Sequence, residues 1–187
     1  MSEMQRRTIE SIPMTRADEG KMVISGKFIS FTDTYNVCPS AVETISPDLV
    51  IEGDDIRALI NHDTTLVLGR TKADTLTITR KDDGIYADID INPKDTDATN
   101  LYARVERGDV SQCSFGFDIL DEETEYLEDG VVKWTIKKIR LYEVSVCTFP
   151  AYQDTHVDAR EAQLETMKKR ETETWKLNMT KRLKGED

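Results

Sequence analysis

VSQCSFGFDIL, at residues 110–120, combines strand-forming residues with a regular alternation of apolar and small or polar side chains. Successive side chains of a β-strand point to opposite faces of a sheet, so this alternation predicts a strand with one core-facing side. The stretch therefore predicts one strand of a β-rich domain. Its expected core-facing residues are Cys113, Phe115, Phe117 and Ile119.

Several other runs share this strand-forming composition, and many are bounded by Gly or Asp. We predict a mainly β fold of the α+β class, with a closed or nearly closed β-barrel core flanked by helices, because closure hides exposed strand edges. The additional predicted strands lie at residues 22–31, 57–61, 65–68, 76–79, 85–91, 131–136 and 138–149.

One segment between the predicted strands has helical rather than strand periodicity. Residues 97–107 place four apolar side chains on one face, and Gly108 follows where a left-handed C-terminal cap is expected. A helix is thus predicted directly before the Ser114 segment. Its apolar face would consist of Ala98, Leu101, Tyr102 and Val105.

The chain divides into three predicted parts by composition. Residues 1–20 are polar and aperiodic, which predicts a flexible segment, and residues 21–157 hold the predicted folded domain. Residues 158–187 are charged and helix-prone, with only a thin apolar stripe, which suits a solvated or partner-dependent helix. That stripe consists of Leu164, Met167 and Trp175.

Composition excludes several classes of protein. The 187 residues are 38% hydrophobic and 33% charged, and no apolar stretch approaches the roughly 18 residues that a membrane span needs. No signal-peptide pattern follows Met1, and three scattered cysteines suggest a reducing, cytoplasmic setting rather than a disulfide framework. A net charge of -11 opposes binding to nucleic acid. We therefore expect neither nucleic acid nor a membrane as a partner.

Ser114 is the candidate nucleophile within the opening stretch. It lies on the face opposite Phe115, where Gln112 and Gly116 leave room for a substrate carbonyl, whereas Ser111 would share the core-facing side. Alternation alone leaves open an inert serine that faces solvent.

The chain has only two histidines, which limits the candidates for a base near neutral pH. His62 follows the predicted strand at residues 57–61, and a strand end can hold a side chain firmly. A surface or half-buried histidine in a loop remains the alternative interpretation of His62, and His156 lies beyond the Pro150 turn.

Glu143 is unusual because it interrupts the apolar strand LYEVSVC at residues 141–147. Its charge needs a partner, and a hydrogen bond to the His62 imidazole would fix the tautomer of that ring. A salt bridge to Lys138 or Arg140, or a strand with one wet face, is the structural alternative.

Other kinds of site fit the sequence less well. No Gly-x-Ser-x-Gly elbow, phosphate-binding loop or His-Glu-x-x-His motif is present. Cys113 and Cys147 fall in apolar strand positions, where a free cysteine usually acts as a small hydrophobe rather than a nucleophile.

Taken together, five blocks of the chain resemble the prohead proteases of tailed phages, serine peptidases distantly related to the herpesvirus assembly protease. Their order and spacing span most of residues 22–157. The blocks are RALINHD at 57–63, VLGRT at 67–71, RGDVS at 107–111, SFGF at 114–117, and LYEVS at 141–145 continuing to TFPAY at 148–152.

The resemblance implies a serine endopeptidase that acts through an acyl-enzyme and needs no metal or organic cofactor. By motif position, Ser114 is the nucleophile and His62 the base. Glu143 is the expected third member, with His156 as the alternative and Asp63 a weaker one. Backbone N–H groups near Gly69 and Arg70, or near Arg140, are candidates to hold the oxyanion.

The resemblance also implies substrates and a location. The protease would cut segments of scaffold and capsid protein, and segments of itself, inside the assembling prohead in the host cytoplasm. Self-association of the protease is possible. The competing hypothesis is a non-enzymatic scaffold or assembly module, which would have no reason to retain Ser114, His62 and Glu143 together.

Overall fold

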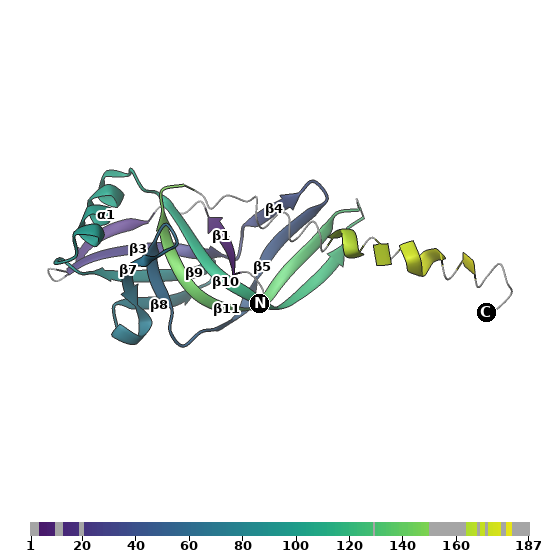
Figure 1. Ribbon diagram of the computed structural model, residues 1–187, viewed down its shortest axis with the longest axis horizontal. Coiled ribbons are helices and arrows are strands. Elements are labelled where there is room, and N and C mark those ends of the chain that lie inside the picture. Colours follow the sequence, from purple (N-terminus) through teal and green to yellow (C-terminus); the bar gives the residue numbers. More distant parts are fainter. Residues whose placement is uncertain are drawn as a thin grey trace.

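Two β-sheets make up most of the structure, a computed structural model (Figure 1). In the larger sheet the strands follow the order β1-β10-β11-β5-β4, and β6 and β7 extend it beside β11. The second sheet has the order β2-β3-β9-β8. The structure describes residues 4–9, 13–18, 21–128, 130–149, 164–167, 169–170, 172–176 and 179–180.

The strands of the larger sheet are β1 (Gln5–Ile9), β4 (Thr34–Cys38), β5 (Ala41–Glu52), β6 (Arg57–Ile60), β7 (Asp63–Arg70), β10 (Gln112–Tyr126) and β11 (Val132–Cys147). Those of the second sheet are β2 (Met14–Asp18), β3 (Lys21–Ser30), β8 (Leu76–Lys81) and β9 (Gly84–Ile91). A short 3-10 turn, Thr71–Ala73, links β7 to β8. The strands predicted from sequence are confirmed in these positions, whereas β1, β2, β4 and β5 were not predicted.

β11 organises the larger sheet because it pairs along both of its edges. It runs antiparallel to β10 on one side and parallel to β5 and then β6 on the other. The two predicted runs at residues 131–136 and 138–149 are joined in this one strand, whose pairing with β5 shifts register between Ile136 and Lys138. β10 and β11 thereby form the long central ribbon of the molecule (Figure 1).

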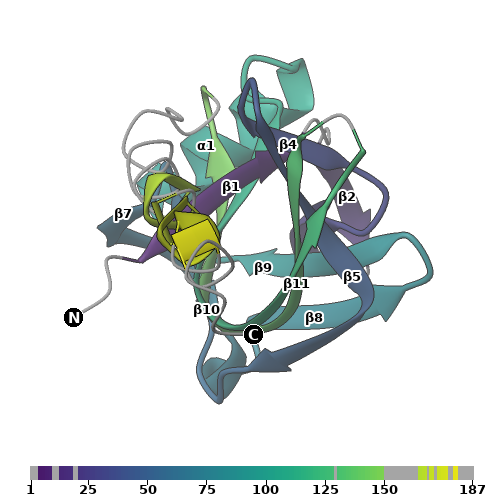
Figure 2. The same cartoon turned by 90° about the vertical axis from the view of Figure 1, so that its right-hand side faces the viewer.

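The hydrophobic core lies between the two sheets, whose strands surround a common centre in Figure 2. The alternation predicted for residues 113–119 is confirmed, since Cys113, Phe115 and Phe117 are fully buried and Ile119 packs against the same cluster. The stacked rings of Phe115 and Phe117, with centroids 4.7 Å apart, contribute to this face.

Helix α1 (Thr96–Arg107) is confirmed with the predicted face and cap. The Asp95 side chain accepts hydrogen bonds from the backbone N–H groups of Asp97 and Ala98, which caps the N-terminus. Gly108 ends the helix at φ 87°, a left-handed conformation that glycine adopts without steric cost. The buried residues are Ala98, Leu101, Tyr102 and Val105, as expected.

The mainly β fold is confirmed, whereas the closed form of the predicted barrel is not found among the described strands. The fold is mainly β with helices, but across the described residues the strands form two sheets that are not closed into a barrel. The described pairings keep the strands in two groups, since β6 and β7 pair within the larger sheet, while β2, β3, β9 and β8 pair with one another.

The two ends of the chain contribute more structure than composition suggested. Although the folded domain was expected to begin near Lys21, β1 pairs with β10 and β2 pairs with β3. The described residues of the segment at 158–187 are helical and lie at the end of the molecule opposite α1 (Figure 1). Leu164 is buried in a cluster with Trp134. Within the described part of the chain, none of the helices is long and apolar enough to cross a bilayer.

Candidate active site

The site is built on one face of β11 and its neighbours. In the antiparallel pairing with β10, Ser114 lies opposite Ser145 and Gly116 lies opposite Glu143. Cross-strand partners share a face and residues two apart do so as well, so these four residues project from the same side of the sheet. The opposite side carries Phe115 and the core.

His62 reaches this face from the tight turn between β6 and β7. Ile60 pairs with Asp63, so Asn61 and His62 are the two turn residues, at φ 50° and 61°. Positive φ at both positions is the signature of a two-residue hairpin, and it is costly for a non-glycine residue such as His62. The His62 backbone N–H donates to Ser145 Oγ at 3.2 Å, which ties the turn to β11.

The imidazole of His62 and the carboxylate of Glu143 are in direct contact. His62 Nδ1 lies 2.7 Å from Glu143 Oε1, and the two side chains are only 7% and 4% exposed. The second oxygen, Glu143 Oε2, accepts a hydrogen bond from Ser145 Oγ at 2.5 Å. A carboxylate held at both oxygens can fix the orientation of the imidazole ring.

The structural alternatives considered for Glu143 are not formed. Lys138 Nζ lies 2.7 Å from Glu52, and Arg140 Nη2 lies 3.4 Å from the same carboxylate. Both cations therefore bind the Glu52 carboxylate of the neighbouring strand β5. Glu143 instead forms its described hydrogen bonds with His62 and Ser145.

Ser114 lies on the same face but is engaged elsewhere. Its side chain is fully buried, and its hydroxyl donates to the Arg7 carbonyl at 2.9 Å. Thr8 Oγ1 donates in turn to Ser114 Oγ at 3.3 Å. His62 Nε2, the nitrogen opposite the Glu143 contact, is buried without a hydrogen-bond partner among the described residues.

Ser145 is a site residue that was not predicted, and Gly116, expected to leave room for a substrate carbonyl, instead leaves room for Glu143. A Cβ on Gly116 would lie 2.3 Å from Glu143 Oε1, so only glycine leaves room for the carboxylate to lie across β10. The sequence held a signal for Ser145, because Glu143 and Ser145 are polar residues two apart in an apolar strand and therefore share a face.

The alternative candidates for the nucleophile and for the third member of the triad lie in different parts of the chain. Ser111 precedes β10 and is half-buried, while His156 lies outside the described residues. Asp63 Oδ1 accepts hydrogen bonds from Thr65 Oγ1 at 2.6 Å and from its backbone N–H at 2.8 Å, which lowers the Asp63 pKa. Asp63 is thus occupied within its own turn.

The cysteines offer no nucleophile beside His62. Cys113 is fully buried on the core face. Burial, aided by the charge of Glu143, raises the pKa of the Cys147 thiol to about 12. A thiol with so high a pKa remains protonated near neutral pH and is a poor nucleophile.

A cleft opens beside the His62–Glu143 pair. It is lined by Met4, Arg57, Leu59, His62, Thr64, Val67, Asp118, Tyr142 and Glu143. Its lining combines the apolar side chains of Met4, Leu59 and Val67 with polar and charged groups that could orient a bound peptide.

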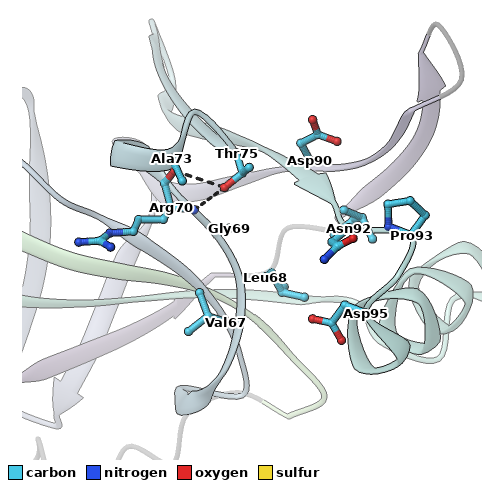
Figure 3. Close-up of a pocket in the computed structure, with 11 residues that line it drawn as sticks. Val67, Leu68, Gly69, Arg70, Ala73, Thr75, Asp90, Asn92, Pro93 and Asp95 are labelled. Atoms are coloured by element: carbon cyan, nitrogen blue, oxygen red, sulfur yellow. Dashed lines mark hydrogen bonds between the residues drawn. The ribbon is translucent and has the colours of Figure 1, made fainter.

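The residues expected to hold the oxyanion line neighbouring clefts, which share Val67 and Tyr142 with this one. Figure 3 shows a second cleft, to which Gly69 and Arg70 contribute, and its lining includes neither His62 nor Glu143. There the Arg70 backbone N–H already donates to Thr75 Oγ1 at 2.9 Å. Arg140 lines a further cleft beside Glu52.

The chain is similar to known phage proteases. A family model described as Caudovirus prohead serine protease matches residues 10–170 of this chain. The chain is similar to the prohead protease of Enterobacteria phage HK97, with 28% identity over 158 residues that cover 80% of this chain and 67% of that protein. It is also similar to the solved capsid assembly protease gp21 of bacteriophage T4, at 12% identity and a TM-score of 0.41, covering 79% of this chain and 96% of that one.

Proposed function

This chain belongs to the caudovirus prohead serine proteases, and on that premise we propose that Ser114 is its nucleophile, His62 its general base and Glu143 the acid that orients the base. The buried contact of 2.7 Å between His62 Nδ1 and Glu143 Oε1 carries the proposal. In this arrangement Nδ1–H donates to the carboxylate, so Nε2 is the acceptor that can take a proton.

The proposed roles correspond to acyl-enzyme chemistry. His62 Nε2 takes the Ser114 proton as Oγ attacks a peptide carbonyl, and the negative charge moves to the carbonyl oxygen. Collapse of this intermediate breaks the C–N bond, and the imidazolium gives its proton to the leaving amine. Water, deprotonated by His62, then attacks the acyl-enzyme, which releases the new carboxylate and restores the Ser114 hydroxyl.

The substrates we propose are scaffold and capsid-protein segments, together with parts of the protease itself. The support is the membership of the prohead protease family and the likeness to a phage prohead protease. Such processing takes place inside the assembling prohead in the host cytoplasm, without a metal or organic cofactor.

Co-expression with the cognate capsid protein tests this function. Intact-mass measurement should find shortened capsid protein with the wild-type chain and full-length capsid protein with Ser114→Ala. Ser111→Ala is the matched control and should still cleave, because Ser111 precedes β10 and is not in the register that places Ser114 opposite Ser145. Full-length capsid protein with both the wild-type chain and Ser114→Ala would sink the protease proposal.

The same assay ranks the third member of the triad. Glu143→Gln keeps the size of the side chain but favours the wrong imidazole tautomer, so kcat should fall on the order of 10⁴-fold. His156→Ala should leave cleavage near the wild-type rate. Loss of cleavage in His156→Ala with activity retained in Glu143→Gln would reverse the assignment.

A further inference from the structure

β1 occupies the edge of β10 beside the proposed nucleophile. The two strands are antiparallel, with Thr8 opposite Ser114 and Ile9 opposite Cys113. β1 is the terminal strand of the larger sheet, so its departure would uncover the β10 edge along Ser114. An exposed edge of this kind pairs readily with an extended peptide.

β1 also accepts a hydrogen bond from the hydroxyl of the proposed nucleophile. Ser114 Oγ donates its proton to the Arg7 carbonyl oxygen at 2.9 Å, while His62 Nε2 has no hydrogen-bond partner within the described structure. A hydroxyl that donates to a carbonyl oxygen faces the wrong atom for attack, which requires approach to the carbonyl carbon and transfer of the proton to the base. The Arg7 peptide is therefore not placed as a substrate, although it occupies the Ser114 hydroxyl.

Two buried anchors hold β1 in this place. The Arg7 guanidinium binds Glu43 of β5 through Nε at 2.7 Å and Nη2 at 2.9 Å, and it also lies over the Phe117 ring. Ile9 is 2% exposed and belongs to the main core. Both anchors lie on the core face, whereas Thr8 faces Ser114.

We propose that β1 is an internal blocking strand, which occupies the place of an extended peptide substrate beside Ser114 and must leave before the substrate binds. The inference rests on the proposed function of Ser114. An enzyme blocked in this way has a low competent fraction, and its apparent affinity and rate fall by that fraction. An extended peptide competes with β1 for the same edge of β10.

A substitution at position 9 can fix β1 to β10 covalently without changing Thr8 or Ser114. Cross-strand partners have Cα atoms about 4.5–5.5 Å apart, within the range that a disulfide spans. Ile9→Cys in the full chain would therefore bond to the reduced thiol of Cys113 on oxidation. We expect labelling of the protein by a fluorophosphonate, which reacts with an activated serine, to slow about tenfold or more in the oxidised form and to recover on reduction.

The opposite change at the same position releases the strand. Ile9→Asp places a charge in the core whenever β1 is docked, so it favours the undocked state and should speed labelling about tenfold. Ile9→Val keeps the apolar contact and should label at the wild-type rate. Wild-type protein carried through the same oxidation and reduction controls for the remaining thiols, and circular dichroism reports folding of each variant.

The outcomes separate the two proposals. Equal labelling of the oxidised and reduced Ile9→Cys protein, with the disulfide verified by mass, would overturn the blocking strand. A folded Ile9→Asp protein that labels no faster than the wild type would also overturn it. If no form, including folded Ile9→Asp, shows labelling that Ser114→Ala abolishes, the assignment of Ser114 itself fails, and with it the inference.

Discussion

The Ser145 hydroxyl forms hydrogen bonds with both members of the proposed His62–Glu143 pair. It donates to Glu143 Oε2 at 2.5 Å and accepts from the His62 backbone N–H at 3.2 Å. Through these contacts one buried side chain positions both the carboxylate and the turn that carries the imidazole. We therefore treat Ser145 as a positioning residue that does not itself touch substrate.

Ser145→Ala should lower kcat about 10- to 100-fold with little change in KM, because a hydrogen bond to a charged group is worth about 1.5–3 kcal/mol. Peptide-cleavage kinetics measure both constants. Ser30→Ala removes another fully buried hydroxyl, one that contacts Thr32 instead, and should leave kcat unchanged. Equal kcat for Ser145→Ala and wild type would show that Glu143 is held without this hydroxyl.

Gly116 makes space for the carboxylate in a way that substitution can test. A Cβ there would lie 2.3 Å from Glu143 Oε1, so Gly116→Ala should displace Glu143 from His62 and reduce kcat about 100-fold or more. Gly108→Ala is the control, because Gly108 has φ 87° and open space around it. That change should cost about 1 kcal/mol of stability without affecting kcat. Activity retained in Gly116→Ala would contradict the observed packing.

At the scale of elements, the turn between β6 and β7 is under backbone strain. Asn61 has φ 50°, and its Oδ1 accepts a hydrogen bond from the Thr148 backbone N–H at 2.9 Å. Asn61→Ala should lower the free energy of unfolding by about 1–2 kcal/mol, since alanine is unfavourable at positive φ and loses the hydrogen bond. Asn61→Gly should recover part of this loss in urea denaturation. Identical midpoints for the two variants would argue against strain at the turn.

The strands predicted from sequence are runs rich in strand-forming residues, and alternation adds the core face in one of them. Residues 113–119 alternate strictly, and their predicted core face is the observed one. β5 was missed because its inward positions include Glu43 and the strand is interrupted by Pro47. β1 was missed because its sequence, QRRTI, is polar, and the burial of Arg7 depends on Glu43, which lies far away in sequence.

The same physical limit applies to the site. The Ser114 face and the oddity of Glu143 follow from local alternation, so they could be predicted. The covering of Ser114 by β1 could not, because it depends on a strand pairing that joins residues more than one hundred positions apart. Tertiary pairing of this kind has no local signal in the sequence.

At the scale of the whole molecule, the charged C-terminal segment is attached to the β-structure by a small apolar cluster. Leu164 is 5% exposed and packs with Ala41, Val132 and Trp134. Leu164→Ala should lower the free energy of unfolding by about 2 kcal/mol, measured in urea. Glu165→Ala, at the exposed neighbouring position, should have no effect. Equal stability of both variants would mean that this packing contributes nothing in solution.

The identity of the reactive serine tests the central claim most directly. After reaction with a fluorophosphonate, mass spectrometry of the digested protein should locate the adduct on Ser114, and His62→Ala should abolish it. Ser145 offers the sharpest alternative, because it contacts both His62 and Glu143. An adduct on Ser145 or Ser111, or one on Ser114 that survives His62→Ala, would contradict the proposed catalytic arrangement.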